Sequence, residues 1–317
     1  MTYSGSEKVA IIIVNYRTGE LVVNCLESLK CICNESVNVF VVDNCSGDNS
    51  VQLIGDWISN NHNTYLICSE KNLGFSGGNN LAIEYVKKTG FIAEFFWLLN
   101  PDTLVFQSSL QYLLLFLKKN SQVGITGSRL VYPDGKCQSS AFRFHTVFSE
   151  LDNGLRLGII SKLLNNWQVS FPISEENICV DWVSGASMLV RKQLFDDVGL
   201  FDDGYFLYFE ETDFCLQAKK SGWSCWHIPN SKVIHFAGAS TEIRNGSRKR
   251  LPCYWFQSRK RYFLKNHGKK YLFLVNVVWS ISFSLFRIRQ KIQNKQDDSP
   301  SYLLRDFVYF NFFNKYF

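Results

Sequence analysis

Residues 9–16 have the sequence VAIIIVNY, a run of β-branched and apolar residues that ends at two polar side chains. Such a run is typical of a strand that is buried on both faces of a parallel sheet. Three further apolar runs follow at 37–42, 65–68 and 95–99, and the segments between them place apolar residues at helical spacing. This alternation predicts an α/β fold with a Rossmann-like, mostly parallel central sheet flanked by helices.

Each of these strands leads into polar residues. Asn15 and Tyr16 follow the first strand, Asp43 follows the second, and residues 100–102 (NPD) follow the fourth. The third strand is followed by the glycine-rich segment 72–79, NLGFSGGN. Ligands of open α/β sheets bind outside the carboxyl ends of the strands. The sequence therefore predicts a binding site at this edge of the sheet.

The glycine-rich segment has two interpretations. Gly74 and Gly77 precede a predicted helix at 81–86, and they would let the backbone come close to a ligand. Free N–H groups and the helix dipole would then favour an anion. The alternative is a turn followed by an ordinary helix start. A dinucleotide fingerprint is excluded, because the segment follows the third strand and lacks the G-x-G-x-x-G spacing.

Asp102 is a candidate metal ligand. It comes directly after an apolar strand and behind Pro101, whose ring fixes the local φ. Mg²⁺ and Mn²⁺ prefer oxygen ligands, and Mg²⁺ sites often use one or two carboxylates together with substrate phosphates. An aspartate that merely caps a helix is the alternative interpretation.

Three acids, Glu210, Glu211 and Asp213, follow the aromatic segment 206–209. Partial burial beside aromatic rings would raise the pKa of one carboxyl group and suit it to proton abstraction. The alternative is that the helix dipole simply favours acids in a first turn. His235 lies in a strand-like apolar run, where a lone histidine is more often a core residue than a metal ligand.

The composition fits a folded enzyme. With 317 residues, 46% of them hydrophobic and 20% charged, the chain can bury one large core. The polar residues 1–8 predict no secretory signal peptide. The ten cysteines show no metal-ligand or disulfide-framework spacing, which indicates thiols in a reducing cytosol.

Charge divides the chain into two parts. Residues 1–242 contain 18 Lys+Arg and 25 Asp+Glu, whereas residues 243–296 contain 14 Lys+Arg and no acid. We therefore predict a catalytic domain over 1–242, with a nucleotide-binding half to about residue 105 and an acceptor-binding half after it. Residues 243–317 form a basic, aromatic, helical extension.

The extension has several interpretations. Its basic clusters at 248–250, 259–261 and 269–270 alternate with aromatic residues, and the apolar run 271–286 is shorter than the ~20 residues of a spanning helix. Such a pattern suits an interfacial segment at an anionic cytoplasmic leaflet, so residues 243–296 are predicted to contact the membrane surface. Nucleic-acid binding is the rival that we do not favour. A helical appendage or a homo-oligomer contact is the third alternative.

Six segments, in chain order, resemble glycosyltransferase family 2, above all its bacterial rhamnosyltransferase-like and galactofuranosyltransferase-like members. They lie within roughly residues 8–240 and are VAIIIVNYRTGE, VFVVDNCSGDNS, NLGFSGGNN, FFWLLNPDT, DWVSGASMLVRK and FDDGYFLYFEETDFCLQAKKSGW. No single segment is specific, but the ordered set is. The resemblance implies a GT-A fold and inverting transfer from a nucleotide-diphosphate sugar, assisted by Mg²⁺ or Mn²⁺.

The resemblance also implies metal and donor residues. The D-x-D metal motif of the family falls on residues 100–102, so its first aspartate is Asn100 here and Asp102 is the main carboxylate ligand. In galactofuranosyltransferase-like relatives a late histidine completes the metal site, and His235 occupies that position. The implied donor contacts are Val14, Asn15, Tyr16, Asp43, Asn72, Gly74, Gly77, Asn79, Asn100 and Asp102.

The acidic pair that carries the catalytic base in the family falls on Glu210 and Glu211. The second acid is usually aspartate there, so Glu211 is one methylene longer. Glu211 is the predicted base, with Glu210 and Asp213 as the other candidates. The implied acceptor-side residues are Asp181, Trp182 and Gly185.

The resemblance implies transfer of L-rhamnose from dTDP-rhamnose to a hydroxyl of a glycan or polyprenyl-linked glycan, in cell-surface polysaccharide synthesis. The expected location is the cytoplasm, peripheral to the inner face of the cell membrane. One alternative is a UDP-sugar donor carrying galactofuranose, glucose or N-acetylhexosamine. An inactive nucleotide-sugar-binding scaffold is the alternative from another class. A nucleotidyltransferase is disfavoured, because residues 15–19 lack its glycine-rich, basic signature.

Overall fold

The computed structural model describes residues 7–236, 250–295 and 299–313. Its strands form one large mixed sheet and one small two-stranded sheet. The strands are β1 (Val9–Asn15), β2 (Val37–Asp43), β3 (Thr64–Cys68), β4 (Phe95–Leu99), β5 (Thr103–Val105), β6 (Val123–Val131), β7 (Ala141–Phe142), β8 (Ile178–Val180), β9 (Trp182–Val183), β10 (Ser187–Arg191) and β11 (Ser224–His235).

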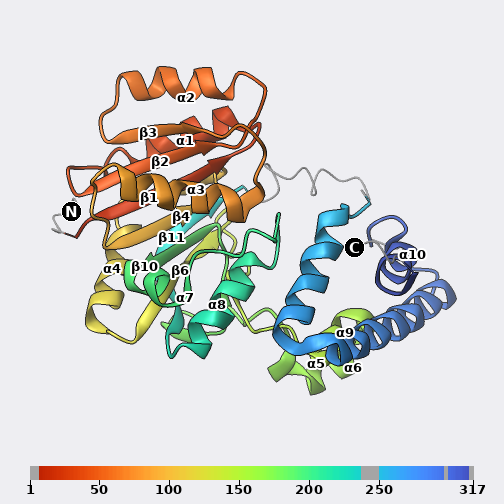
Figure 1. Cartoon of the computed structure of the whole chain (residues 1–317). Coiled ribbons are helices and arrows are strands. Elements are labelled where there is room, and N and C mark those ends of the chain that lie inside the picture. Colours follow the sequence, from red (N-terminus) through yellow and green to blue (C-terminus); the bar gives the residue numbers. More distant parts are fainter. Residues whose placement is uncertain (1–6, 237–249, 296–298, 314–317) are drawn as a thin grey trace.

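The large sheet has the strand order β3-β2-β1-β4-β10-β6-β11-β5, with β8 paired to β11. Figure 1 shows β3, β2, β1 and β4 side by side. β3, β2, β1 and β4 are parallel to one another. β10 runs antiparallel to β4 and β6, and β5 runs antiparallel to β11. The sheet is therefore parallel in the part that holds the predicted nucleotide edge and mixed beyond it.

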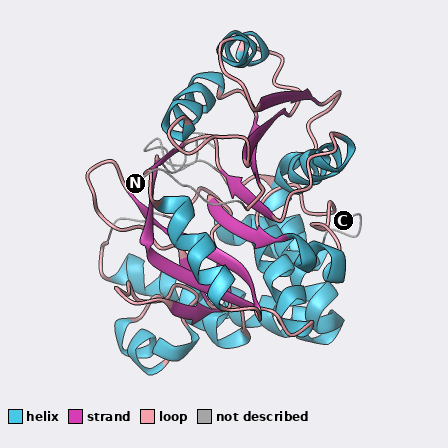
Figure 2. Ribbon diagram, turned by 90° about the vertical axis from the view of Figure 1, so that its left-hand side faces the viewer, coloured by secondary structure: helices cyan, strands magenta, loops and turns pink. Residues whose placement is uncertain are grey.

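Helices cover both faces of this sheet (Figure 2). Two further helices and a π-helical turn follow the last strand. The helices are α1 (Gly19–Leu29), α2 (Ser50–Ser59), α3 (Gly74–Lys88), α4 (Ser109–Lys119), α5 (Val147–Leu155), α6 (Gly158–Leu163), η1 (Asn165–Trp167), α7 (Lys192–Val198), α8 (Glu210–Lys220), α9 (Cys253–Ile292), α10 (Leu303–Val308) and η2 (Tyr309–Phe313).

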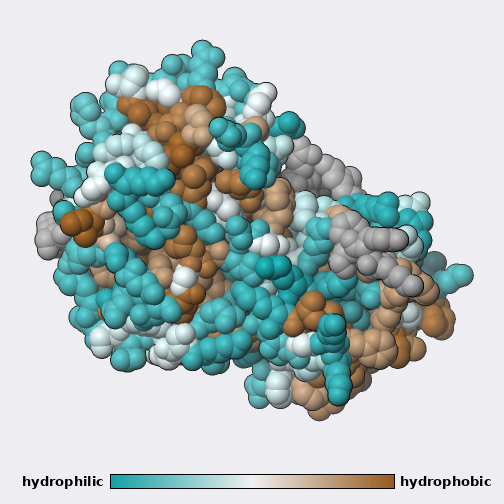
Figure 3. Space-filling model, viewed as in Figure 1, coloured by the Kyte–Doolittle hydropathy of each residue, from teal (hydrophilic) through white to brown (hydrophobic). Residues whose placement is uncertain are grey.

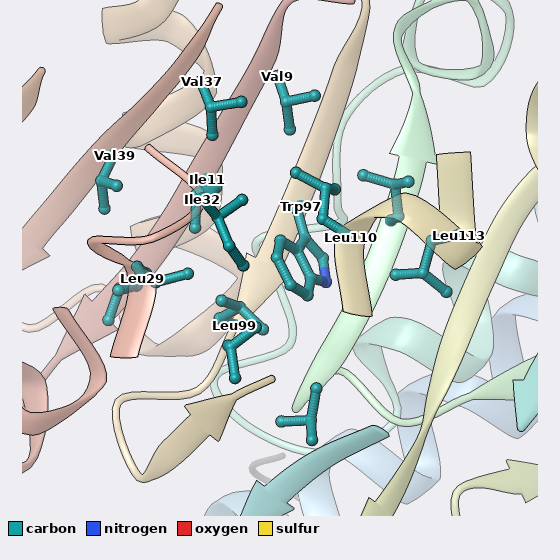
Figure 4. Packing of buried hydrophobic residues seen from close by; sticks show 14 of the residues in the cluster. Val9, Ile11, Leu29, Ile32, Val37, Val39, Trp97, Leu99, Leu110 and Leu113 are labelled. Carbon is teal, nitrogen blue, oxygen red and sulfur yellow. The ribbon is translucent and has the colours of Figure 1, made fainter. Parts of the chain in front are cut away.

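The alternation of side chains along β1 explains the two helical layers. Val9 and Ile11 belong to the core shared with α1, α2 and α4, whereas Ala10 and Ile12 belong to the core shared with α3, α7 and α8. Figure 4 shows Val9 and Ile11 among the aliphatic side chains that surround Trp97. Since successive strand residues point to opposite faces, an unbroken apolar run buries both faces.

The four predicted strands are confirmed as β1 to β4, and so is the predicted α/β architecture with a central sheet flanked by helices. The helix after β3 begins earlier than predicted. Residues 74–79, which we predict from their glycines to be a loop, form the first turns of α3. Glycine lowers helix propensity, but the tertiary context of a segment routinely overrides its propensity, as it does here.

α9 is bent rather than straight, because Gly268 has non-helical φ and ψ of 82° and 172°. We call residues 253–267 the proximal segment of α9 and residues 269–292 its distal segment. By length and composition α9 is the one described helix that could cross a membrane, with a window of mean hydropathy 1.6 that is 33% buried in the protein. The distal segment packs against α5, where Tyr271 Oη accepts the backbone N–H of Val147 at 2.9 Å.

Several basic and aromatic residues of the extension are used inside the protein. Arg259 is 2% exposed and donates to Glu150 of α5 at 2.6 Å. Tyr262 and Phe263 are buried, and Arg261 pairs with Asp202 at 2.7 Å. The proximal segment therefore docks on the catalytic part, which corrects the prediction that these side chains face a membrane. The predicted basic residues 248 and 249 lie outside the described residues.

Candidate active site

Asp43 and Asn15 are neighbours at the carboxyl ends of β2 and β1, where the strand register pairs them. Asn15 Nδ2 donates to Asp43 Oδ1 at 2.8 Å. Ser46 donates its hydroxyl to the same oxygen at 2.5 Å and its backbone N–H to Oδ2 at 3.1 Å. The buried Asp43 carboxylate is thus fixed in place, while Tyr16, one residue beyond the strand, is exposed.

Asn44 fastens the glycine-rich segment to this edge. Its Oδ1 accepts the backbone N–H of Leu73 at 2.9 Å. Its Nδ2 donates to Asn72 Oδ1 at 3.0 Å and to the carbonyl of Gly74 at 2.9 Å. The segment is therefore held against the end of β2 by one side-chain amide.

The glycines of this segment have packing reasons. Gly74 has φ of +70°, and a Cβ there would lie 2.1 Å from the carbonyl oxygen of Phe206. A Cβ on Gly78 would lie 2.6 Å from Val14 Cγ1, and one on Gly77 would lie 2.7 Å from Leu73 Cβ. These contacts explain the glycines as close packing of α3 on β1 and on the loop before α8.

Asn79 has a local role in the same helix, because its Nδ2 donates to the carbonyl of Phe75 at 2.8 Å. The backbone N–H of Phe75 donates to the carbonyl of Phe206 at 2.8 Å. The start of α3 is therefore joined to the loop that leads into the acids of α8.

The three predicted metal residues lie together. β5 and β11 pair so that Thr103 is opposite His235, which brings His235 beside the turn 100–102. His235 Nε2 lies 3.4 Å from Asp102 Oδ1 and 3.5 Å from Asn100 Nδ2. Asp102 is 1% exposed, and within the described residues neither of its carboxylate oxygens has a hydrogen-bond partner.

Gln138 fixes the orientation of the histidine. Its Nε2 donates to the carbonyl of His235 at 2.6 Å, so its Oε1, 3.1 Å from His235 Nδ1, is the acceptor. Nδ1 then carries a proton, and Nε2 lies beside both the Asp102 carboxylate and the side-chain amide of Asn100. A carboxylate and an imidazole nitrogen are ligand types for a divalent cation, and the hydrogen bond on Nδ1 is the outer contact that ligating histidines use.

The acids of α8 follow a strained turn. Tyr208 and Phe209 have φ of 72° and 68°, and non-glycine residues held in this region cost free energy that often marks a functional site. Glu210 is buried, and burial together with the charge of Glu211 raises the pKa of Glu210 well above its usual range. Burial also raises the pKa of Glu211, opposed by hydrogen bonds from the backbone N–H groups of Glu211 and Gly185.

The turn at Gly185 joins the acids to the metal residues. A Cβ on Gly185 would lie 3.1 Å from Phe75 Cζ and 3.8 Å from Glu211 Oε1. The next carbonyl, that of Ala186, accepts the backbone N–H of Asn100 at 3.1 Å. One turn therefore touches the carboxylate of α8 on one side and the start of the 100–102 turn on the other.

The other predicted acceptor-side residues differ in their contacts. Trp182 stacks on Phe142, with ring centroids 4.1 Å apart, and its Nε1 donates to the carbonyl of Arg143 at 2.9 Å. Asp181 accepts Lys219 Nζ at 2.8 Å and the backbone N–H of Phe144 at 2.9 Å. Trp182 presents an aromatic stack, whereas both oxygens of Asp181 are occupied by the protein.

The sequence is similar to those of known glycosyltransferases. Residues 10–162 match the family described as glycosyl transferase family 2. The N-acetylglucosaminyl-diphospho-decaprenol L-rhamnosyltransferase of Mycobacterium tuberculosis strain H37Rv is 26% identical over 245 residues, 73% of this chain and 76% of the relative. The dTDP-rhamnosyl transferase RfbF of Shigella flexneri is 23% identical over 254 residues, 77% of this chain and 76% of the relative.

Residues 10–162 therefore correspond to a glycosyl transferase family 2 domain. Its fold is that of solved transferases as well. The mannosyltransferase PcManGT from Pyrobaculum calidifontis, solved with GDP-Man and Mn²⁺, superposes with a TM-score of 0.58 at 13% identity, covering 92% of this chain and 76% of that one. The protein is a glycosyltransferase of GT-A fold.

Asp213 stands apart from the other acids of this glycosyltransferase. Its Oδ2 accepts Lys265 Nζ at 2.6 Å, and its Oδ1 accepts Asn266 Nδ2 at 2.6 Å. Both partners belong to the proximal segment of α9. Because both oxygens serve this docking contact, the geometry favours Glu210 and Glu211 over Asp213 for the chemistry.

Two residues of the glycosyltransferase site were not predicted from the sequence. Asn44 directly follows Asp43 in a polar turn, so its position at the strand end was a usable signal. Gln138 carried no local signal. It reaches His235 only because the chain between β6 and β7 lies beside the end of β11.

Proposed function

We propose that this glycosyltransferase inverts the anomeric carbon of an L-rhamnosyl donor, dTDP-rhamnose, and transfers the sugar to a glycan hydroxyl. One observation carries the proposed reaction. The turn at Gly185 and Ala186 contacts Glu211 on one side, and on the other it accepts the backbone N–H of Asn100, which begins the turn that carries Asp102. The proposed base and the proposed metal residues would thereby lie on the two sides of one turn, as an inverting displacement needs.

Glu211 is the proposed base. Its raised pKa, caused by burial, makes the carboxylate a stronger proton acceptor, and one oxygen has no hydrogen-bond partner among the described residues. Glu211 would take the proton from the acceptor hydroxyl as that oxygen attacks the anomeric carbon. Glu210 would stay protonated, because two adjacent buried carboxylates disfavour a second charge.

Asp102 and His235 are the proposed ligands of Mg²⁺ or Mn²⁺, with Asn100 as a neutral contributor. When bound, the ion would neutralise charge on the nucleoside diphosphate. Within the described residues no cluster of three His, Cys, Asp or Glu side chains could hold a metal. The remaining coordination positions are therefore proposed for donor phosphate oxygens and water.

The donor would lie along the parallel edge of the sheet. Asp43 and Asn15, held in one hydrogen-bonded group, are proposed to orient the nucleotide. Residues Asn72, Gly74, Gly77 and Asn79 at the start of α3, with Val14 beneath them and Tyr16 beside them, would form the wall of the donor site.

The rhamnosyl donor and the lipid-linked acceptor are supported by the relatives. Two of them are named as rhamnosyltransferases, one acting on a decaprenyl-linked sugar and one using dTDP-rhamnose. The acceptor is thus proposed to be a glycan or polyprenyl-linked glycan for the cell surface. Synthesis would take place in the cytoplasm, at the inner face of the membrane.

A donor screen tests this proposal. Nucleoside-diphosphate release would be followed with dTDP-rhamnose and with UDP-linked galactofuranose, glucose and N-acetylglucosamine, each with Mn²⁺, Mg²⁺ or EDTA. We expect turnover of dTDP-rhamnose that EDTA abolishes. Turnover of a UDP-sugar alone would overturn the donor, and binding without any turnover would favour a scaffold.

The base assignment has its own test. Glu211→Gln should lower kcat by about 10²–10⁴-fold, because the amide cannot accept the proton, while donor affinity changes little. The exposed substitution Glu70→Gln is the control. Normal turnover by the Glu211→Gln protein would remove Glu211 from the base role.

A further inference from the structure

The distal segment of α9 is apolar on two faces. One face packs against the protein, where Trp279 Nε1 donates to Asn153 of α5 at 3.2 Å. Asn276 on the same face accepts Arg259 at 2.6 Å and donates to Asn311 at 3.2 Å. The buried apolar members of this face are Leu272, Val275, Trp279 and Phe283.

The opposite face carries apolar side chains that the described residues leave exposed. Ile281 and Ile288 are 57% and 58% exposed. The spacing of seven, four, three and four residues aligns one stripe along the helix, which consists of Leu274, Ile281, Leu285, Ile288 and Ile292. A stripe of this length is unusual on a surface that contacts only water.

α6 extends this stripe. Its Ile159 and Leu163 are 71% and 75% exposed. The chain just before α6 touches the distal segment, because Arg289 Nη2 donates to the carbonyls of Leu155 and Arg156 at 2.9 and 2.8 Å. Figure 3 shows hydrophobic side chains gathered in the region where Figure 1 draws α6 and the distal segment.

Positive charge surrounds these apolar residues. Lys269 and Lys270 begin the distal segment, Lys291 and Lys295 lie at its end, and all four are exposed. Lys162 is exposed in α6 between the two apolar residues. Residues 250–295 contain no acid. Exposed aliphatic side chains edged by lysines match an anionic lipid surface, where each cation near the headgroups adds attraction.

We propose that α6 and the distal segment of α9 form a membrane-docking surface, which binds an anionic leaflet with α9 lying flat. A spanning helix would need lipid on all sides. Here the inner face carries Asn276, hydrogen-bonded to the buried Arg259, and insertion would strip that bond. The surface excludes the basic proximal segment and includes α6, which lies far away in the sequence.

The relation of the docking surface to the sugar acceptor rests on the proposed function. α5 begins beside the aromatic stack of Trp182, whose Nε1 bonds Arg143, and it ends where Arg156 meets Arg289. Nine helical residues span about 14 Å. The docking surface is therefore one short helix away from the proposed acceptor side, which suits an acceptor whose lipid stays in the leaflet.

Vesicle co-sedimentation of the full chain tests the surface. Phosphatidylcholine vesicles with and without phosphatidylglycerol would be compared at low and high salt. We expect binding that needs phosphatidylglycerol and weakens with salt. Each of Ile281→Glu and Ile288→Glu should weaken it about tenfold or more, as loss of one buried aliphatic side chain predicts. Leu115→Glu, on the exposed face of α4, is the matched control and should bind like the native chain.

A second pair, Ile159→Glu and Leu163→Glu in α6, guards against misfolding of a single variant. Native binding by both pairs would overturn the proposal, as would failure of the native chain to bind. The rival occupant of this surface is a second copy of the chain, and sedimentation velocity tests for it. Surface variants that turn a dimer into a monomer without changing vesicle binding would assign the surface to a dimer contact. Glu211→Gln should still bind vesicles, and the surface variants should still turn over donor with a water-soluble acceptor, so this inference can fail separately from the proposed function.

Discussion

Glu210 and Glu211 stand side by side at the start of α8, and each has one carboxylate oxygen without a hydrogen-bond partner among the described residues. A fold that needed only stability would place solvated or neutral groups there, because an unpaired buried carboxyl costs free energy. The turn before them adds strain through the positive φ of Tyr208 and Phe209. Such local cost is expected where the arrangement serves chemistry.

This cost gives a prediction for Glu210→Gln. The folded-state pKa of Glu210 is raised by burial and by the charge of Glu211, so the unfolded chain loses this proton at a lower pH than the folded chain. Native stability should therefore fall as pH rises above the ordinary glutamate pKa of about 4.3. The Gln variant lacks this loss and should be more stable at pH 7 by about 1 kcal/mol, with the gain shrinking toward pH 5.

Urea unfolding of both proteins between pH 5 and 8 measures the difference. Glu70→Gln, at an exposed position, should leave the pH dependence unchanged. A Glu210→Gln protein that is less stable than the native chain at pH 7 would contradict the assignment of Glu210 as a strained, desolvated acid.

Gln138 gives the second prediction at the residue scale. Its amide holds Nδ1 of His235 as the donor and leaves Nε2 facing Asp102. Gln138→Ala should weaken Mn²⁺ binding about 10–100-fold, because the ring loses its fixed orientation. Titration of Mn²⁺ in the presence of nucleoside diphosphate, followed by electron paramagnetic resonance, measures this. Gln122→Ala, whose side chain is exposed, is the control, and equal affinities would show that Gln138 does not orient a ligand.

At the scale of elements, the proximal segment of α9 is hydrogen-bonded to α8. Lys265 Nζ bonds Asp213 at 2.6 Å and Asp202 at 2.8 Å. Lys265→Met leaves the buried Asp213 carboxylate with only uncharged hydrogen-bond partners among the described residues, so we expect a loss of about 1–3 kcal/mol in unfolding free energy. The double variant Lys265→Met with Asp213→Asn should recover much of this loss, because the unpaired charge is removed as well.

The same pair of variants tests the catalytic assignment. If Asp213 only docks α9, the double variant should keep kcat within about tenfold of the native value, far from the general-base loss of 10²–10⁴. Steady-state rates measured beside urea unfolding separate the two readouts. A double variant that is stable but inactive would make Asp213 a candidate for the catalytic base again.

The elements also explain what the sequence could predict. β1 and β4 were predictable because a buried parallel strand needs an unbroken apolar run, and both have one. The start of α3 was not predictable, because glycine is needed at positions 74 and 78 by close contacts with Phe206 and Val14, which lie elsewhere in the chain. The basic residues of α9 were misassigned for the same reason, because a pair such as Arg259 and Glu150 leaves no local pattern.

At the scale of the whole molecule, one buried ion pair joins the C-terminal helices to the catalytic part. Arg259 donates to Glu150 of α5 at 2.6 Å and to Asn276 beyond the bend of α9 at 2.6 Å. Burial raises the pKa of Glu150, but the charge of Arg259 and the hydrogen bond with His145 outweigh it and hold the pKa below its usual range. The stabilisation from this pair is therefore fully present at pH values above the ordinary carboxyl pKa. It is lost as the pH falls through the lowered pKa of Glu150.

This pair supports the last prediction. Arg259→Met should cost about 3–5 kcal/mol of unfolding free energy at pH 7, because it strands a buried carboxylate. Arg261→Met, two residues away, removes a half-exposed arginine from Asp202, which keeps its bond to Lys265, and should cost no more than about 1 kcal/mol. Urea unfolding at pH 7 compares the two, and the Arg259→Met deficit should shrink at lower pH as Glu150 takes up its proton. Equal costs for both variants would mean that Arg259 does not anchor the C-terminal helices, and the docking surface on the distal segment would then need another attachment to the catalytic part.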